Sequence, residues 1–303
     1  MTGILADAMT GSCTICGQSV TPAITAPERM FGLGGAFTYG RCAGCGVLVL
    51  LDPPDDLAPF YPSGYYAFEP RPAVTRGRVD RFLRRNRVRL RRLPKRLGWM
   101  NGLVGPDSRI VDYGSGTGAF VADLRRQGLD RAVGVDAFAP AGPYVQRELP
   151  HAPIDLVTMH HSLEHIPDQR AVLRRLSEHQ SVGGHLFIRT PLADSFAAQE
   201  YGSDWVQLDP PRHLVVHTPT SLGRLLEAAG YTLVRHWRDS TGFQFWGSEL
   251  YRRGLTLADP RTPAHDGGLF SAKQLRAFEM RAAELNAAGR GDQGCFLFRR
   301  EAR

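Results

Sequence analysis

The fold of this chain can be predicted from one stretch of sequence, R109-I-V-D-Y-G-S-G-T-G-A-F-V-A-D-L-R-R-Q-G128. A short apolar segment runs into three closely spaced glycines, and a segment with apolar residues at helical spacing follows. Glycines at such a turn let a ligand approach the backbone, and the free N–H groups at the start of the helix attract polar groups. The next apolar segment, A132-V-G-V-D136, ends in an acid that can accept hydrogen bonds from both ribose hydroxyls. The pattern predicts strands alternating with helices around a nucleotide-like ligand.

The glycine turn by itself fits two classes of ligand. Gly114, Gly116 and Ala119 match the dinucleotide pattern G-x-G-x-x-G/A, and Asp136 is placed for NAD. Asp112, two residues before the first glycine, instead favours a ligand with an amino group, because its negative charge would repel a pyrophosphate.

Several motifs together resemble the class I S-adenosylmethionine-dependent methyltransferases. The match runs from about Arg109 to Tyr231 and includes D-x-G-x-G-x-G at 112–118, S-L-E-H-I-P-D at 162–168 and G-G-H-L-F-I-R-T-P at 183–191. The run W205-V-Q-L-D-P-P-R-H-L-V-V-H-T-P-T-S-L-G-R-L-L-E-A-A-G-Y231 resembles a branch that acts largely on small metabolites, sugars and natural products. The resemblance implies an α/β fold with a Rossmann-like seven-stranded mixed sheet, and S-adenosylmethionine as the cofactor.

The resemblance also implies roles for individual residues at the cofactor. Asp112 and the glycine turn would hold the methionine end, Asp136 and Ala137 would lie at the ribose, and His160 would border the methionine moiety. The turn residues concerned are Gly114, Ser115, Gly116 and Gly118. Between Asp136 and Asp155 the chain is too short for the helix, strand and adenine-contacting acid that the family usually has there. We therefore expect a shortened or rebuilt edge of the sheet.

Candidate catalytic residues follow two of the expected strands. Methyl transfer needs an in-line nucleophile, and it needs a general base only if the acceptor must lose a proton. His161 is the first candidate base, whereas Glu164 and His165 are either catalytic or structural parts of their loop. We expect a second group, with His213 as an acid/base candidate or a hydrogen-bonded core histidine, to line the acceptor pocket: Trp205, Asp209, Arg212, His213 and His217. Tyr65 and Tyr66 in the connector either reach that pocket or pack in the core.

Four cysteines near the N-terminus predict a metal site. They form C13-T-I-C16-G and C42-A-G-C45-G, two tight turns whose thiolates can face one point. Four thiolates suit tetrahedral Zn²⁺, and a site filled by four protein ligands is structural. We expect no secretory signal, and disulfides would conflict with that expectation. A redox C-x-x-C needs no matched second pair. We expect the remaining cysteine, Cys295, to be a buried strand residue.

Composition and charge restrict the remaining possibilities. The chain has 303 residues, 43% of them hydrophobic and 22% charged, which is typical of one large globular domain or two ordinary ones. We expect no transmembrane helix, and the cytoplasm is the default compartment. Ten Arg and one Lys against one Asp give residues 76–96 a charge of +10, while the whole chain carries +7. The basic residues therefore form one segment, which we expect to be a linking helix with an apolar stripe.

The predicted organisation has three parts. Residues 1–70 form the zinc module and connector, 71–100 the basic linking helix, and 101–303 the cofactor-binding domain, with an insertion at about 240–290 that serves acceptor specificity or a homodimer contact. In domain order the chain resembles the deoxysugar C-methyltransferases.

The leading hypothesis is methyl transfer to an O or N, less readily a C, of a small molecule such as a sugar or natural-product intermediate. Methylation of rRNA or tRNA held by the zinc module and basic helix is an alternative. Against it, the segment R189-T-P-L lacks the N-P-P-[YF] motif, and no aromatic residues are interleaved with the arginines. A protein that binds S-adenosylmethionine without methylating, as a partner-docking module or a cyclising enzyme, is the third hypothesis.

Overall fold

A seven-stranded sheet forms the centre of the protein. The computed structural model describes residues 11–62, 78–139, 142–262 and 268–302. The strand order is β10-β11-β8-β7-β4-β5-β6, and β11 runs antiparallel to both of its neighbours while the other pairs are parallel. The strands are β4 (Ile110–Tyr113), β5 (Ala132–Val135), β6 (Val145–Gln146), β7 (Ile154–His160), β8 (Gln180–Pro191), β10 (Tyr231–Arg238) and β11 (Gln293–Arg300). The mixed seven-stranded sheet expected from the sequence is confirmed.

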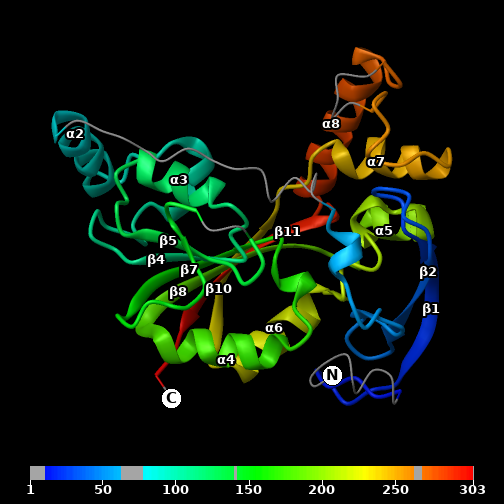
Figure 1. The fold of residues 1–303 in the computed structure, drawn as a ribbon, viewed down its shortest axis with the longest axis horizontal. Helices are drawn as coiled ribbons and strands as arrows, with labels where there is room; N and C mark the ends of the chain where they lie inside the picture. The colour runs from blue at the N-terminus through cyan, green and yellow to red at the C-terminus, as the bar shows by residue number, and fades with distance from the viewer. Residues whose placement is uncertain (1–10, 63–77, 140–141, 263–267, 303) are drawn as a thin grey trace.

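Helices cover both faces of this sheet (Figure 1). One face carries α3 (Ala119–Arg126), and the other carries α4 (Gln169–His179) and α6 (Pro219–Ala228). The central parallel strands are therefore buried on both sides, which is why they consist of continuous apolar residues. Ile110 and Val111 of β4 point to opposite faces, and both are completely buried.

The edge of the sheet next to the glycine turn is shortened, as expected. Strand β6 has only two residues and pairs through Val145 with Gly134 of β5. Residues 136–139 and 142–144, the described part of the connection between the two strands, contain no helix. In the described residues the edge of the sheet therefore consists of a short strand, and the helix that the sequence resemblance implies before it is absent.

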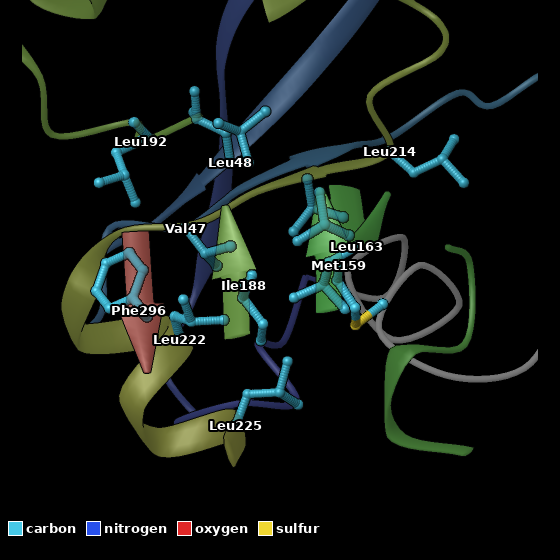
Figure 2. Packing of buried hydrophobic residues seen from close by; sticks show 14 of the residues in the cluster. Val47, Leu48, Met159, Leu163, Ile188, Leu192, Leu214, Leu222, Leu225 and Phe296 are labelled. Atoms are coloured by element: carbon cyan, nitrogen blue, oxygen red, sulfur yellow. The ribbon is translucent and has the colours of Figure 1, made fainter. Parts of the chain in front are cut away.

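A second, four-stranded sheet combines three strands near the N-terminus with one strand from residues 215–216. Its order is β1-β2-β3-β9, with β1 (Val20–Pro27), β2 (Ala36–Cys42), β3 (Leu48–Leu50) and β9 (Val215–Val216). Strand β9 pairs with β3 through Val49 and Val215, although these residues are far apart in sequence. In Figure 2 apolar side chains from both sheets, from the residues beside them and from α6 occupy one core, among them Val47, Leu48, Ile188, Leu192, Leu222 and Phe296. The N-terminal sheet is thus packed on the main domain as an added layer.

The basic segment forms a shorter helix than its apolar spacing suggested. Helix α2 spans Arg78–Arg89, and Lys95–Met100 form a separate 3-10 helix, η3. Leu93 and Leu97 are buried, whereas Leu83 and Leu90 are 57% and 62% exposed. The expectation of a single apolar stripe was therefore wrong. Leu83 is exposed within α2, and Leu90 lies beyond the end of this helix.

The segment 240–290 contains the two helices α7 (Phe243–Arg252) and α8 (Ala272–Ala287), close to α5 (Phe196–Tyr201) in Figure 1. They share a small apolar cluster with Val206. In the described part of the chain, no helix has the length and apolar character required to cross a membrane.

Candidate active site

The glycine turn follows β4 at the carboxyl edge of the main sheet. Gly114, Gly116 and Gly118 have φ angles of 76°, 52° and 83°, and α3 begins directly after them. Two features exclude a side chain at Gly114. Its φ angle is positive, and a Cβ there would lie 2.4 Å from the Ser162 Cβ. The neighbouring Ser115 packs against β5, where a Cβ on Gly134 would stand 2.3 Å from its Oγ. The turn is therefore held tightly between β5 and the loop after β7.

Asp112 is a buried carboxylate at the end of β4. It is 4% exposed and accepts a hydrogen bond of 2.7 Å from Thr158 Oγ1. Burial raises the pKa of Asp112 to about 7; the Thr158 hydrogen bond opposes this rise and the negative charge of Asp136 adds to it. A cationic group bound here would stabilise the ionised form. The site therefore fits a ligand group that carries a positive charge.

Asp136 connects the end of β5 to the glycine turn. Its Oδ2 accepts from the Gly116 N–H at 2.8 Å, and its Oδ1 accepts from the N–H groups of Phe138 and Ala139 at 2.9 and 2.8 Å. The carbonyl of Ala137 accepts from the Arg147 guanidinium. The acid is thus fixed beside the glycine turn by three backbone N–H groups.

His160 ends β7 and is packed between aromatic rings. Its ring lies 4.4 Å from that of Phe120 and 5.1 Å from that of Phe187, measured between centroids. Its buried Nε2 has no hydrogen-bond partner in the described part of the chain. Burial and the nearby Arg189 lower the pKa of His160 to about 3, so the imidazole is neutral.

His161 forms a hydrogen-bonded pair with Glu164. His161 has a φ of 49°, which is unusual for a residue with a side chain. Its Nδ1 lies 3.2 Å from Glu164 Oε1, and its Nε2 lies 3.4 Å from Arg189 Nη1. Because a guanidinium can only donate, Nε2 accepts and the proton sits on Nδ1. In this neutral tautomer the imidazole has its proton toward Glu164, and its Nε2 lone pair accepts from Arg189.

Glu164 is the buried acid of this loop and is fully ionised. Thr190 Oγ1 donates to its Oε2 at 3.1 Å. Burial tends to raise the pKa of Glu164, but the hydrogen bond from His161 and the neighbouring histidines lower it to about 2.

The loop after β7 meets the loop 205–217. The His165 and His213 rings are 4.7 Å apart, and their Nδ1 atoms each lie 2.8 Å from a backbone carbonyl, that of Arg212 and that of Gln207. Since a carbonyl only accepts, each Nδ1 donates, and in the neutral form of each ring Nε2 is the nitrogen that can bind a ligand. One ligand atom from each of Glu164, His165 and His213 lies within 4.8 Å of the others. This combination of donor atoms is suited to a divalent cation.

Arg212 and His217 of the second group are buried in the described part of the chain. Arg212 is completely buried and pairs with Glu28 at 2.8 Å and with Asp209 at 2.5 Å. His217 is completely buried too, and its Nε2 lies 2.8 Å from Gln169 Oε1. Neither residue lines the cavity described below, and their expected place at an acceptor pocket stays a prediction. They satisfy buried polar groups that connect the two sheets.

A cavity of about 610 Å³ opens at the carboxyl edge, on the face of the sheet that carries α3. His160 and Phe187 form part of its wall, together with Arg189, Trp237 and Trp99 of η3. Sequence reasoning missed Arg189, although it lies near the end of an expected strand, where open α/β sheets place their ligands.

Comparison with known proteins decides the family. A family model described as a methyltransferase domain matches residues 75–236, more than half of the chain. The chain belongs to this methyltransferase family. It is an enzyme that depends on S-adenosylmethionine.

Individual relatives of the methyltransferase are distant. A ubiquinone biosynthesis O-methyltransferase of Cupriavidus pinatubonensis is 25% identical over 168 residues, which are 46% of this chain and 67% of the relative. Among solved structures, a SAM-dependent methyltransferase from Archaeoglobus fulgidus is 20% identical with a TM-score of 0.43, over 73% of this chain and 94% of that one. A geranyl diphosphate C-methyltransferase from Streptomyces coelicolor A3(2) is 18% identical with a TM-score of 0.40, over 66% and 74%.

The methyltransferase also carries the cluster of four cysteines predicted from the sequence. The Sγ atoms of Cys13 and Cys45 are 3.7 Å apart, and those of Cys16 and Cys42 are 3.3 Å apart. Four thiolates around zinc, each about 2.3 Å from the metal, stand roughly 3.8 Å from one another. The cluster therefore fits a tetrahedral ion. Cys295 is a buried strand residue, as expected.

A connector tyrosine approaches the histidine cluster of the methyltransferase. The Tyr61 hydroxyl lies 3.1 Å from His165 Nδ1. Tyr65 and Tyr66, the tyrosines selected from the sequence, lie outside the described residues.

Proposed function

We propose that this methyltransferase methylates a hydroxyl oxygen of a small molecule. The observation that carries the proposal is the His161–Glu164 pair, whose unprotonated Nε2 faces Arg189 on the wall of the cavity. An alcohol or phenol becomes a good nucleophile only as its proton leaves, and this pair provides an acceptor for that proton. Oxygen is also the acceptor atom in the name of the C. pinatubonensis relative.

We propose that the cofactor lies across the carboxyl ends of β4 and β5. Bound S-adenosylmethionine supplies an electrophilic methyl group on a sulfonium. The Asp112 carboxylate would take the amino group, and the backbone of the Gly114–Gly118 turn would accommodate the methionine end. Asp136 would hold the ribose, and His160 would close the site from the side of β7. The fit of the buried Asp112 to a cation supports this assignment.

Two arrangements of the same loop can activate the hydroxyl. In the first, His161 takes the proton and Glu164 stabilises the imidazolium that forms. In the second, Glu164, His165 and His213 hold a divalent cation that lowers the pKa of the hydroxyl. Removal of metal separates the two: the first predicts activity that survives chelation, and the second predicts activity lost on chelation and restored by a divalent ion.

The experiment supplies S-adenosylmethionine with a labelled methyl group and two acceptor pools, a small-molecule extract and total RNA. We expect label in the small-molecule pool, on oxygen. The His161→Ala variant should lose roughly 10²–10⁴-fold in turnover, while His151→Ala, at an exposed histidine, keeps full activity. Label confined to RNA would refute the proposal, and an unchanged rate in His161→Ala would refute the arrangement in which His161 is the base.

We further propose that Cys13, Cys16, Cys42 and Cys45 bind a structural zinc ion. The spacing of their sulfur atoms supports this. We also propose that the domain boundaries lie at about residues 70 and 100, and that the segment 240–290 serves acceptor specificity or a dimer contact. Metal analysis of the purified chain should give one zinc per protein, and its absence from freshly purified protein would contradict the assignment.

A further inference from the structure

The cavity beside His160 has an excess of positive charge. Four cationic side chains line it, against a single carboxylate from Asp239: Lys95, Arg96, Arg189 and Arg235. Its volume of about 610 Å³ is in the range of sites for small organic ligands.

Two of these cations are neutralised by carboxylates, and two have no carboxylate partner among the described residues. Arg189 Nε donates to Asp239 at 2.8 Å, and Arg96 pairs with Asp123 at 2.6 Å. For Lys95 and Arg235 the described residues contain no ion pair. Their charge is available to a ligand, because an anion bound there would not have to displace a carboxylate of the protein.

The remaining wall is flat and aromatic. The Trp99 and Phe187 rings are stacked with centroids 4.0 Å apart and planes inclined by 17°. The Arg235 guanidinium lies 4.7 Å from the centroid of the Trp237 ring, which fixes a positive charge beside an aromatic face. A planar apolar group can pack against such surfaces, since offset stacking adds to the burial of area.

One buried polar atom in the wall also lacks a partner. His160 Nε2 is buried without a hydrogen bond in the described part of the chain, and its imidazole lines the cavity. An unsatisfied buried polar atom costs free energy unless a ligand completes it. The cavity is thus built to receive a polar group next to the proposed methionine end.

We propose that this cavity binds the methyl acceptor, and that the acceptor is a small organic anion, a carboxylate or phosphate on a planar apolar body. This inference rests on the proposed function, because it names the substrate class of the same site. Lys95 and Arg235 bind the anionic group, and the planar body packs against Trp99 and Trp237.

The test measures binding of simple probes to the protein saturated with S-adenosylhomocysteine. The probes are 4-hydroxybenzoate, phenyl phosphate, neutral 4-hydroxybenzamide and inorganic phosphate. Calorimetry gives their affinities, and quenching of tryptophan fluorescence reports on Trp99 and Trp237. We expect at least one aromatic anion to bind tenfold or more tightly than the neutral amide. The better of the two anions identifies the anionic group.

Variants distinguish this cavity from the general charge of the chain. In the double variant Lys95→Gln/Arg235→Gln we expect the preference for the anion to disappear, while affinity for S-adenosylhomocysteine stays within about twofold. Lys273→Gln, at an exposed lysine of α8, is the matched control and should keep the preference.

Three results would overturn the inference: equal binding of the neutral amide, an unchanged preference in the double variant, or inorganic phosphate binding as tightly as the aromatic anions. If S-adenosylhomocysteine still binds, each of these results refutes the anionic acceptor and leaves the proposed methyl transfer to oxygen standing. Failure of the wild-type protein to bind S-adenosylhomocysteine would instead remove the proposed function.

Discussion

Replacing Asp112 by Asn tests the cofactor site through the stability of the protein. A pKa raised from 3.8 to about 7 means that the ionised carboxylate costs roughly 4 kcal/mol of folding free energy above pH 7, because each pKa unit is worth about 1.4 kcal/mol. Asn removes the charge but still buries an amide, whose incomplete hydrogen bonding costs about 1–3 kcal/mol. The variant should therefore be about 2 kcal/mol more stable than the wild type at pH 8.

The sign of the pH dependence follows from the raised pKa. The folded protein holds this proton more tightly than the unfolded chain, so wild-type stability falls as pH rises from about 4 to about 7 and is then constant. At pH 5 about a third of the cost is already present. The stability difference between variant and wild type should therefore grow by roughly 2–3 kcal/mol from pH 5 to pH 8.

Urea unfolding at the two pH values measures this difference, with Asp55→Asn, at an exposed carboxyl, as the control. Calorimetry at pH 8 should show that Asp112→Asn binds S-adenosylhomocysteine at least tenfold more weakly, since the amino group has lost its anionic partner. A difference in stability that does not change with pH would refute the argument from burial. Wild-type affinity in the variant would refute the assignment of Asp112 to the cofactor.

Three further substitutions test other parts of the structure. Cys42→Ser should weaken zinc binding by roughly 100-fold or more, since even outer partners of a metal site are worth about 10–100-fold; metal competition titration measures this, and unchanged affinity would exclude the cysteine as a ligand. Gly114→Ala places a methyl group 2.4 Å from the Ser162 Cβ at a φ of 76°. We expect the free energy of unfolding, measured in urea, to fall by about 2 kcal/mol or more, and cofactor binding to become undetectable. Normal binding would contradict the tight turn. Arg212→Met leaves Glu28 buried without its cation and should cost about 3–5 kcal/mol; a cost below about 1 kcal/mol by the same unfolding assay would show that the pair is not needed.

Local sequence patterns predicted the centre of the fold well. The strand, glycine turn and helix around residues 109–128 depend on backbone conformation and on neighbouring apolar residues, so their signals lie within a few residues. The Cys-x-x-Cys turns could be predicted for the same reason, because each pair of cysteines and its turn lie within a few residues. The position of Asp112 and Asp136 at one edge of the sheet then follows from the parallel order of the strands.

Other features depend on contacts between distant segments. Arg212 looked like a pocket residue because charged residues are rarely buried, and its role became visible only with Glu28, which belongs to the other sheet. The exposure of Leu90 depends on where α2 ends. The cationic cavity combines residues of η3, β8 and β10, so no single stretch of sequence contains it.

The pairing of β3 with β9 has a consequence for how this chain is made. On the ribosome, residues 11–50 emerge long before Val215 and Val216, and strand β3 must wait for its partner while more than half of the chain is synthesised. During that time one edge of a three-stranded sheet is open to other chains, which is a risk for aggregation. Early binding of metal by the four cysteines would stabilise the waiting strands. Scarcity of zinc during synthesis should therefore reduce the yield of folded protein more than removal of zinc after folding.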